Sequence, residues 1–181
     1  RLLEGLAKSA EIFGYYRRAE AGEYVGLYNN TVREEVLRRN FLERYRAVAT
    51  PARLPKAMFK FGANHLYHGK NPTQAFPIGN LAHEMARANG ATGFGLYVIA
   101  LGDGYRSYAD YPAWLHPLLP AEPPRNPTIV DLRALRPYQR LLREGVAPEE
   151  VWEQRAVLHG YYAIVILPRS REGERVLGRQ D

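Results

Sequence analysis

The sequence contains no cysteine. Disulfides, thiolate nucleophiles and thiolate metal ligands are therefore excluded. Long apolar runs are also lacking: the longest, residues 93–102, is roughly half of the ~20 residues that a helix needs to cross a bilayer. No secretory leader pattern is visible in the sequence. We therefore expect no membrane partner, and the sequence leaves localisation open between cytoplasm and periplasm.

Charge of one sign is in moderate excess, with 25 Lys and Arg against 19 Asp and Glu and a net charge of +6. A basic balance can indicate a nucleic-acid partner. Along residues 33–44, however, Arg and Glu are interleaved, which predicts a solvated helix face with ion pairs. No nucleic-acid motif accompanies the charge, so we expect no nucleic-acid partner.

Apolar residues at spacings of three and four predict helices over residues 2–18, 31–49 and 78–89. The second of these helices has Thr31 in the N-cap position and Glu34 three residues later. This spacing is typical of a capping box. The sequence therefore places Glu34 in the first turn of an amphipathic helix, on its solvated face.

Four apolar runs are typical of buried strands, at residues 56–62, 94–101, 128–132 and 161–167. The first two flank the predicted third helix, and strand, helix, strand at this length predicts a βαβ unit with parallel strands. The expected fold class is α/β, with a mainly parallel central sheet and flanking helices.

The length of 181 residues suits a single core. We expect residues 1–50 to form a helical hairpin that packs on the sheet, and residues 51–168 to form the α/β part with the site. Residues 169–181 form a charged tail. Within the α/β part, residues 102–127 are expected to be a long irregular loop and residues 147–158 a helix.

The richest polar segment follows the strand predicted at residues 56–62. In an open parallel sheet, ligands bind beyond the carboxyl ends of the strands. His65 is our candidate catalytic residue, because imidazole titrates near neutral pH and can act as a general base. The alternative is a histidine that only caps the strand end. The residues expected to contact a small-molecule substrate are Asn64, Tyr67, His68 and Asp103.

Two carboxylates, Asp103 and Asp131, are candidates to orient His65. For Asp131 the alternative is a structural salt bridge to Arg133. His65 and His68 lack the third ligand that a metal site needs. The sequence therefore predicts neither a metal nor another cofactor.

The run REEVLRRNFLERYRAVATPARLPKAMFKFGANHLYHG, followed by IGNLAHEMARANG and GLYVIALGDG, resembles the C-terminal half of the erythromycin-esterase-like family. The later VDLRAL and GYYAIVILP are similar to that family's tail, so the resemblance covers about residues 33–169. It implies part of a larger α/β hydrolase domain, related to the haem-uptake and Tiki-like proteins.

The resemblance implies hydrolysis of esters by activated water, without a serine nucleophile. His65 matches the second histidine of the family's H-N-x-H motif, and Gly62 stands at the first. The family's other catalytic groups come from its N-terminal half, so an N-terminal portion of the same protein is an expected partner. Arg33 or Arg39 could stabilise the oxyanion, or each could form a surface ion pair. The alternative function is a non-catalytic ligand-binding or interaction protein on the same fold.

Overall fold

The computed structural model describes residues 2–26, 28–50, 53–100, 111–120, 124–148 and 150–167. The chain divides into two compact units, Arg1–Gly93 and Phe94–Asp181. The boundary between them falls inside the segment 51–168 that the sequence predicts to be one α/β part. Within the described ranges, no helix combines the length and the apolar character that a membrane span requires.

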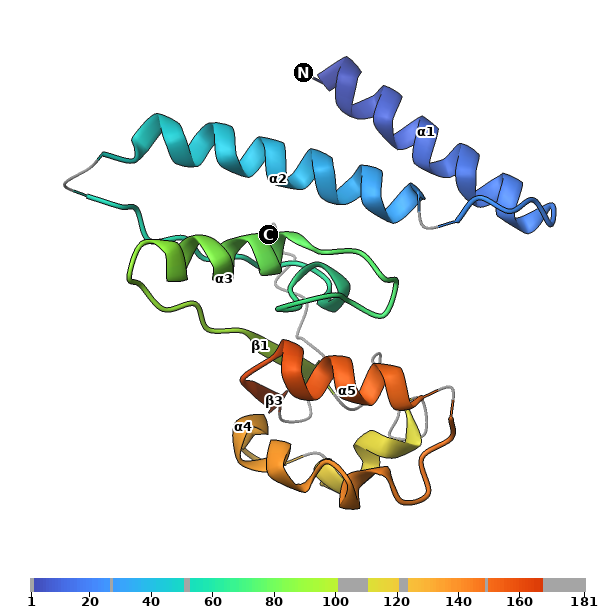
Figure 1. Cartoon of the computed structure of the whole chain (residues 1–181), viewed down its shortest axis with the longest axis vertical. Coiled ribbons are helices and arrows are strands. Elements are labelled where there is room, and N and C mark those ends of the chain that lie inside the picture. The colour runs from blue at the N-terminus through green and yellow to red at the C-terminus, as the bar shows by residue number, and fades with distance from the viewer. Residues whose placement is uncertain are drawn as a thin grey trace, which may run out of the picture. The chain divides into compact units, whose positions relative to one another are not determined.

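The first unit is helical (Figure 1). Its elements are α1 (Leu2–Glu20), α2 (Tyr28–Val48), the 3-10 helix η1 (Ala63–His65) and α3 (Ile78–Ala88). Helices α1 and α2 pack against each other as a hairpin, with Ile12 and Val32 buried, and α3 packs against α2. The three helices that the spacing predicts are confirmed.

The strand predicted at residues 56–62 does not form. This segment is extended but belongs to no sheet, and Met58 is 93% exposed. Phe59 instead packs edge-on against Phe41 of α2, with 4.9 Å between ring centroids. The alternating apolar pattern thus reflects aromatic side chains that pack on a helix, and the predicted βαβ unit is wrong.

The second unit contains the sheet, with strands β1 (Leu96–Ala100), β2 (Thr128–Asp131) and β3 (Ala163–Leu167). The strand order is β1-β3-β2; β1 runs parallel to β3, with Val98 opposite Val165, and β2 runs antiparallel to β3. Strands at these three places are confirmed. The α/β class therefore holds in general, but the described sheet is small and mixed and is not a mainly parallel central sheet.

The core of the second unit is apolar and centres on β3. Ile164 and Ile166 are fully buried, and helix α5 (Val151–Gly160) adds Val157, also at 0% exposure. The sequence predicts that the strand at 94–101 is covered on both faces. That prediction is wrong, because β1 lies at the sheet edge and Val98 is 56% exposed.

Short helices complete the second unit. They are η3 (Ala113–Leu118), α4 (Leu132–Leu135), η4 (Arg136–Tyr138) and η5 (Leu141–Arg143). The described residues 111–120 of the irregular loop predicted at 102–127 thus include the 3-10 helix η3, in which Trp114 is buried at 5% exposure. The helix predicted at 147–158 is present but begins at Val151.

Candidate active site

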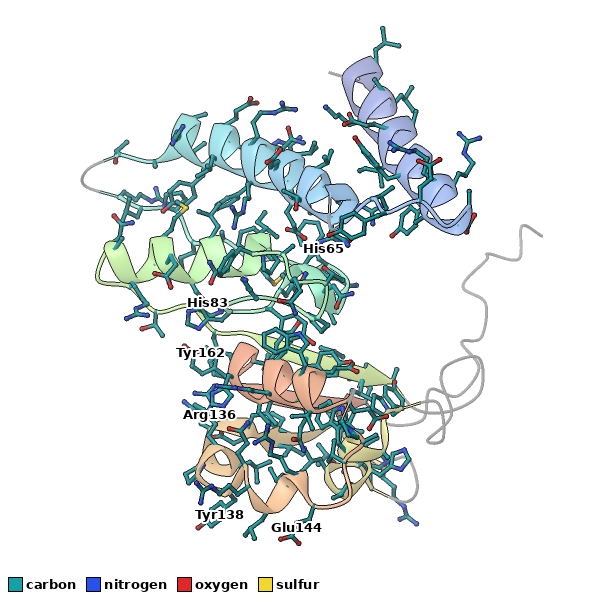
Figure 2. The ribbon with its side chains drawn as sticks, turned by 45° about the vertical axis from the view of Figure 1, so that its right-hand side comes forward. His65, His83, Arg136, Tyr138, Glu144 and Tyr162 are labelled. Atoms are coloured by element: carbon teal, nitrogen blue, oxygen red, sulfur yellow. The ribbon has the colours of Figure 1, made fainter. Side chains whose placement is uncertain are left out.

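His65 lies at the end of η1, in the segment that connects α2 to α3. Its backbone N–H donates to the carbonyl of Gly62 at 3.0 Å, which starts the tight turn. The imidazole lies beneath α2 in Figure 2, and its side chain is 22% exposed. Because no strand precedes η1, a helical turn rather than a strand end positions His65. Because part of the imidazole is exposed, a solute can reach it.

Glu34 of α2 is the direct partner of His65. Its Oε1 lies 2.5 Å from His65 Nδ1, and its Oε2 accepts a hydrogen bond from the backbone N–H of Ile78 at 2.8 Å. The Glu34 side chain is only 5% exposed. A buried carboxylate with both oxygens bonded can hold an imidazole in one orientation.

The capping box predicted for Thr31 and Glu34 is wrong. Helix α2 begins at Tyr28, so Thr31 lies inside the helix rather than at its N-cap. Glu34 faces the first unit's interior, although its charged neighbours in sequence suggested a solvated face. The sequence predicted Asp103 or Asp131 as the carboxylate that orients His65, and it missed Glu34.

The hydrogen bond to Glu34 fixes which nitrogen of His65 carries the proton. A carboxylate accepts hydrogen bonds and does not donate them, so we assign the proton to Nδ1. In the neutral ring, Nε2 then has a free lone pair and can accept a proton. Among the described residues, no hydrogen bond to this Nε2 is present. The arrangement therefore offers a base that a carboxylate orients.

The same carboxylate caps helix α3. The first N–H groups of a helix have no partner inside the helix, and a negative group is favourable at that end. The N-cap residue Pro77 forms no side-chain hydrogen bond, so Glu34 supplies the acceptor from another helix. Glu34 consequently ties together α2, η1 and α3.

Gly79 allows α3 to approach the turn that follows η1. A Cβ atom at Gly79 would lie 2.4 Å from the backbone carbon and oxygen of Leu66. Such a contact is far inside van der Waals range, so only glycine fits without a backbone shift. This close approach keeps His65 near the start of α3.

Asn71 holds the loop between η1 and α3 in place. Its amide donates to the carbonyl of Asn64 at 2.7 Å. Its Oδ1 accepts from the hydroxyl of Thr73 at 2.8 Å and from the backbone N–H of Ala75 at 3.0 Å. Asn71 is 2% exposed, and it is a site residue that the sequence pattern did not predict. An Asn before Pro in a glycine-containing loop was the available clue.

The other predicted site residues lie in different surroundings. Asn64 is exposed beside His65, whereas Tyr67 is 2% exposed and belongs to the interior. His68 lies 3.3 Å from Glu84 of α3, measured from Nε2 to Oε1, and so has a carboxylate partner of its own. Asp103 lies outside the described residues.

His83 is buried at 6% exposure. Its ring lies 4.8 Å from that of His68, between centroids. Burial lowers the pKa of His83, and the nearby His68 lowers it further. Chain packing explains the burial, because a Cβ atom at Gly93 would lie 2.4 Å from His83 Nδ1. In the described part of the chain, no cluster of three or more His, Asp or Glu side chains could hold a metal ion.

Asp131 belongs to the second unit and is already engaged there. Its side chain accepts from the backbone N–H of Arg133 at 2.9 Å and pairs with the guanidinium at 2.8 Å. These hydrogen bonds lower the pKa of Asp131 to about 2. The salt-bridge alternative for Asp131 is thus confirmed. Nearby, Arg136 lies 5.9 Å from the ring centroid of Tyr162 (Figure 2).

Two small hollows, of about 140 and 160 Å³, lie between α1 and α2. Small-molecule pockets usually measure about 300–1,000 Å³. The hollows are lined from α2 by residues such as Val36 and Arg39, and neither is lined by Glu34 or His65. The chemistry of the Glu34–His65 pair, rather than the size of a cavity, therefore marks the candidate site.

Compared with family models, curated proteins and solved structures, the chain matches none. Its function is inferred below from the residues of the site.

Proposed function

We propose that this chain is a hydrolase-like protein that acts on esters of small molecules, with His65 as general base and Glu34 as its orienting residue. The observation that carries the proposal is the 2.5 Å contact between the buried Glu34 carboxylate and His65 Nδ1. A carboxylate that holds one imidazole nitrogen while the other accepts a proton is a recurrent device in acyl-transfer sites. The sequence resemblance to the erythromycin-esterase-like family supports the same chemistry.

The proposed reaction uses water as the nucleophile. His65 Nε2 takes a proton from water while the water oxygen forms a bond to the ester carbonyl carbon, and the carbonyl π electrons move to the oxygen. The C–O bond to the alcohol then breaks as the carbonyl re-forms, and His65 returns the proton to the departing alkoxide. The Glu34 carboxylate accepts the hydrogen bond from Nδ1 and stabilises the transient imidazolium.

Substrate contacts are proposed for residues around His65. Asn64 is the exposed amide next to it and can donate a hydrogen bond to a substrate oxygen. His68, which is partly exposed three residues after His65, remains a proposed substrate-binding residue. The family resemblance adds that further catalytic groups come from an N-terminal portion of the same protein.

An assay with a panel of activated and natural-type esters tests this proposal. General-base catalysis typically contributes about 10²–10⁴-fold, so His65→Ala should lower kcat/KM by about that factor. Glu34→Gln should give a similar loss, because its amide N–H₂ would donate to Nδ1 and move the ring proton to Nε2. His159→Ala is the matched control, since this exposed histidine of the second unit contacts Gln139 and should leave turnover unchanged. Equal turnover by wild type and His65→Ala would overturn the catalytic role.

A second candidate function is non-catalytic binding of a small molecule at the same residues. It is favoured by the observation that both Glu34 oxygens are bonded, so this carboxylate cannot also serve as a separate acid. Ligand-observed NMR with the same ester panel distinguishes the two functions. Binding without turnover, weakened by Asn64→Ala, would support the binding function.

A further inference from the structure

Arg38 lies on the same face of α2 as Glu34, one turn further along the helix. Residues four apart are neighbours on a helix surface. Phe41 continues this face and packs on Phe59, which belongs to the segment leading to His65. Arg38 therefore lies on the face of α2 that is turned toward the candidate site, between Glu34 and Phe41 in sequence.

Arg38 has no partner among the described residues. Its Nε atom is buried and makes no hydrogen bond, and no ion pair of Arg38 is present in this part of the chain. The expected partner of an arginine at this position is the glutamate one turn earlier. Here Glu34 gives one oxygen to His65 and the other to the N–H of Ile78.

A buried N–H without an acceptor is unfavourable, and a native protein rarely keeps one without a reason. A guanidinium has five N–H donors in a planar fork that matches the oxygens of a carboxylate or a phosphate. The missing partner of Arg38 is thus best supplied by an oxyanion. Glu34 cannot fill this role without releasing His65 or the start of α3.

The charge distribution favours an anionic ligand at this unit. Residues 1–93 contain fourteen Lys and Arg against eight Asp and Glu, a net charge of +6. Residues 94–181 contain eleven of each, a net charge of zero. The whole excess positive charge of the chain therefore belongs to the unit with the candidate site, where it raises the local concentration of anions.

We infer that Arg38 is a binding residue for an oxyanion group, a carboxylate or a phosphate, carried by the small-molecule substrate. This inference rests on the proposed function in that it names the substrate class of the same site. The partial burial of Arg38 favours a small anion over a nucleic acid, because a duplex binds to exposed rows of basic side chains.

Binding of inorganic phosphate and of benzoate, followed by calorimetry and by the imidazole resonances of the histidines, tests the inference without any need for turnover. Wild type should bind at least one of the two, and Arg38→Gln should weaken that binding by tenfold or more. Arg38→Lys should give an intermediate loss, since it keeps the charge without the fork. Arg44→Gln, at an exposed position of the same helix, is the matched control and should bind as wild type does.

The outcomes of these experiments separate the possibilities. Binding that survives in His65→Ala but not in Arg38→Gln supports the inference even if no ester is hydrolysed, so the proposed function can fail alone. Absence of binding in wild type overturns the inference, as does equal binding by wild type and a folded Arg38→Gln. Binding of a short DNA duplex that Arg38→Gln and Arg44→Gln weaken equally would instead indicate a general basic surface.

If an anionic ester is a substrate, Arg38→Lys should raise KM and leave kcat nearly unchanged. A lower kcat with an unchanged KM would overturn the role of Arg38 in substrate binding.

Discussion

The interiors of the two units of this chain are stabilised by different kinds of contact. The second unit has an apolar core around β3, with Ile164 and Ile166 fully buried, no net charge, and Gln154 as the buried polar side chain among its described residues. The first unit carries the entire net charge and buries polar side chains, among them Glu34, Asn71 and His83. Apolar packing is tolerant of similar side chains, whereas buried polar groups need specific partners. The candidate chemistry therefore belongs to the unit with the more demanding core.

The largest effect is expected from truncation of the apolar core. Ile164→Ala should lower the free energy of unfolding of the second unit by about 2–5 kcal/mol. Both tryptophans, Trp114 and Trp152, belong to this unit, so their fluorescence reports its unfolding alone. Val98→Ala, at a 56% exposed position of β1, is the control and should cost little. An equal loss in both variants would contradict the proposed core.

A smaller loss is expected where α3 meets the turn after η1. Gly79→Ala should destabilise the first unit by about 1–3 kcal/mol, because the new Cβ overlaps the backbone of Leu66. Gly5→Ala is the matched control, since nothing lies near its Cβ position in α1 and the change should stabilise the helix by about 0.5–1 kcal/mol. The resonances of His65 and His83 during denaturation measure both effects. Stabilisation by Gly79→Ala would show that α3 does not approach Leu66.

Substitution of the buried Glu34 should lower the free energy of unfolding of the first unit by more than the loss of one charge would. Glu34→Ala leaves the Ile78 N–H and His65 Nδ1 without their acceptor, and should cost the first unit about 1–3 kcal/mol. Glu34→Gln retains an oxygen for Ile78 and should cost less. Hydrogen exchange at the Ile78 amide measures the difference. Slow exchange in both variants would mean that Glu34 does not cap α3.

Acid should weaken the first unit through His83. Its pKa lies below 6.5 in the folded chain, so the unfolded chain binds a proton more readily. The stability of the first unit should therefore be highest above pH 6.5 and should fall as the pH drops below 6.5 toward the folded pKa. His83→Gln should flatten this dependence in urea titrations of the histidine resonances. An unchanged slope in the variant would assign the effect to another group.

The smallest effect is expected at the exposed pair of Asp131 and Arg133. The pKa of Asp131 is lowered from 3.8 to about 2, so its contribution is present above pH 3.8 and is lost as the pH falls through about 2. Asp131→Asn keeps an oxygen to cap α4 and should lower the stability of the second unit slightly above pH 3.8, with no difference from wild type below about pH 2. Thermal unfolding followed by tryptophan fluorescence at pH 2 to 5 measures it. A large shift of the melting temperature at neutral pH would mean that the pair stabilises the second unit by more than an exposed salt bridge usually does.

The sequence predicted those parts of the fold that depend on local pattern. Three helices, three strands and the polar segment around Asn64 and His65 follow from spacing and from loop residues. The prediction of a strand at 56–62 was wrong because apolar side chains that alternate along an extended segment can pack on a helix such as α2 as well as in a sheet. Glu34 was missed because its partners lie 31 and 44 residues away, and a charged helix face gives no local clue to such contacts.

Because Glu34 bonds both His65 and Ile78, the orientation of the imidazole depends on the folding of the first unit. Its two bonds span 31 and 44 residues, so neither can form until long loops have closed. A nascent or partly unfolded chain would have the imidazole but not its fixed tautomer. The proposed site should therefore be complete only after α2, η1 and α3 have come together in the first unit.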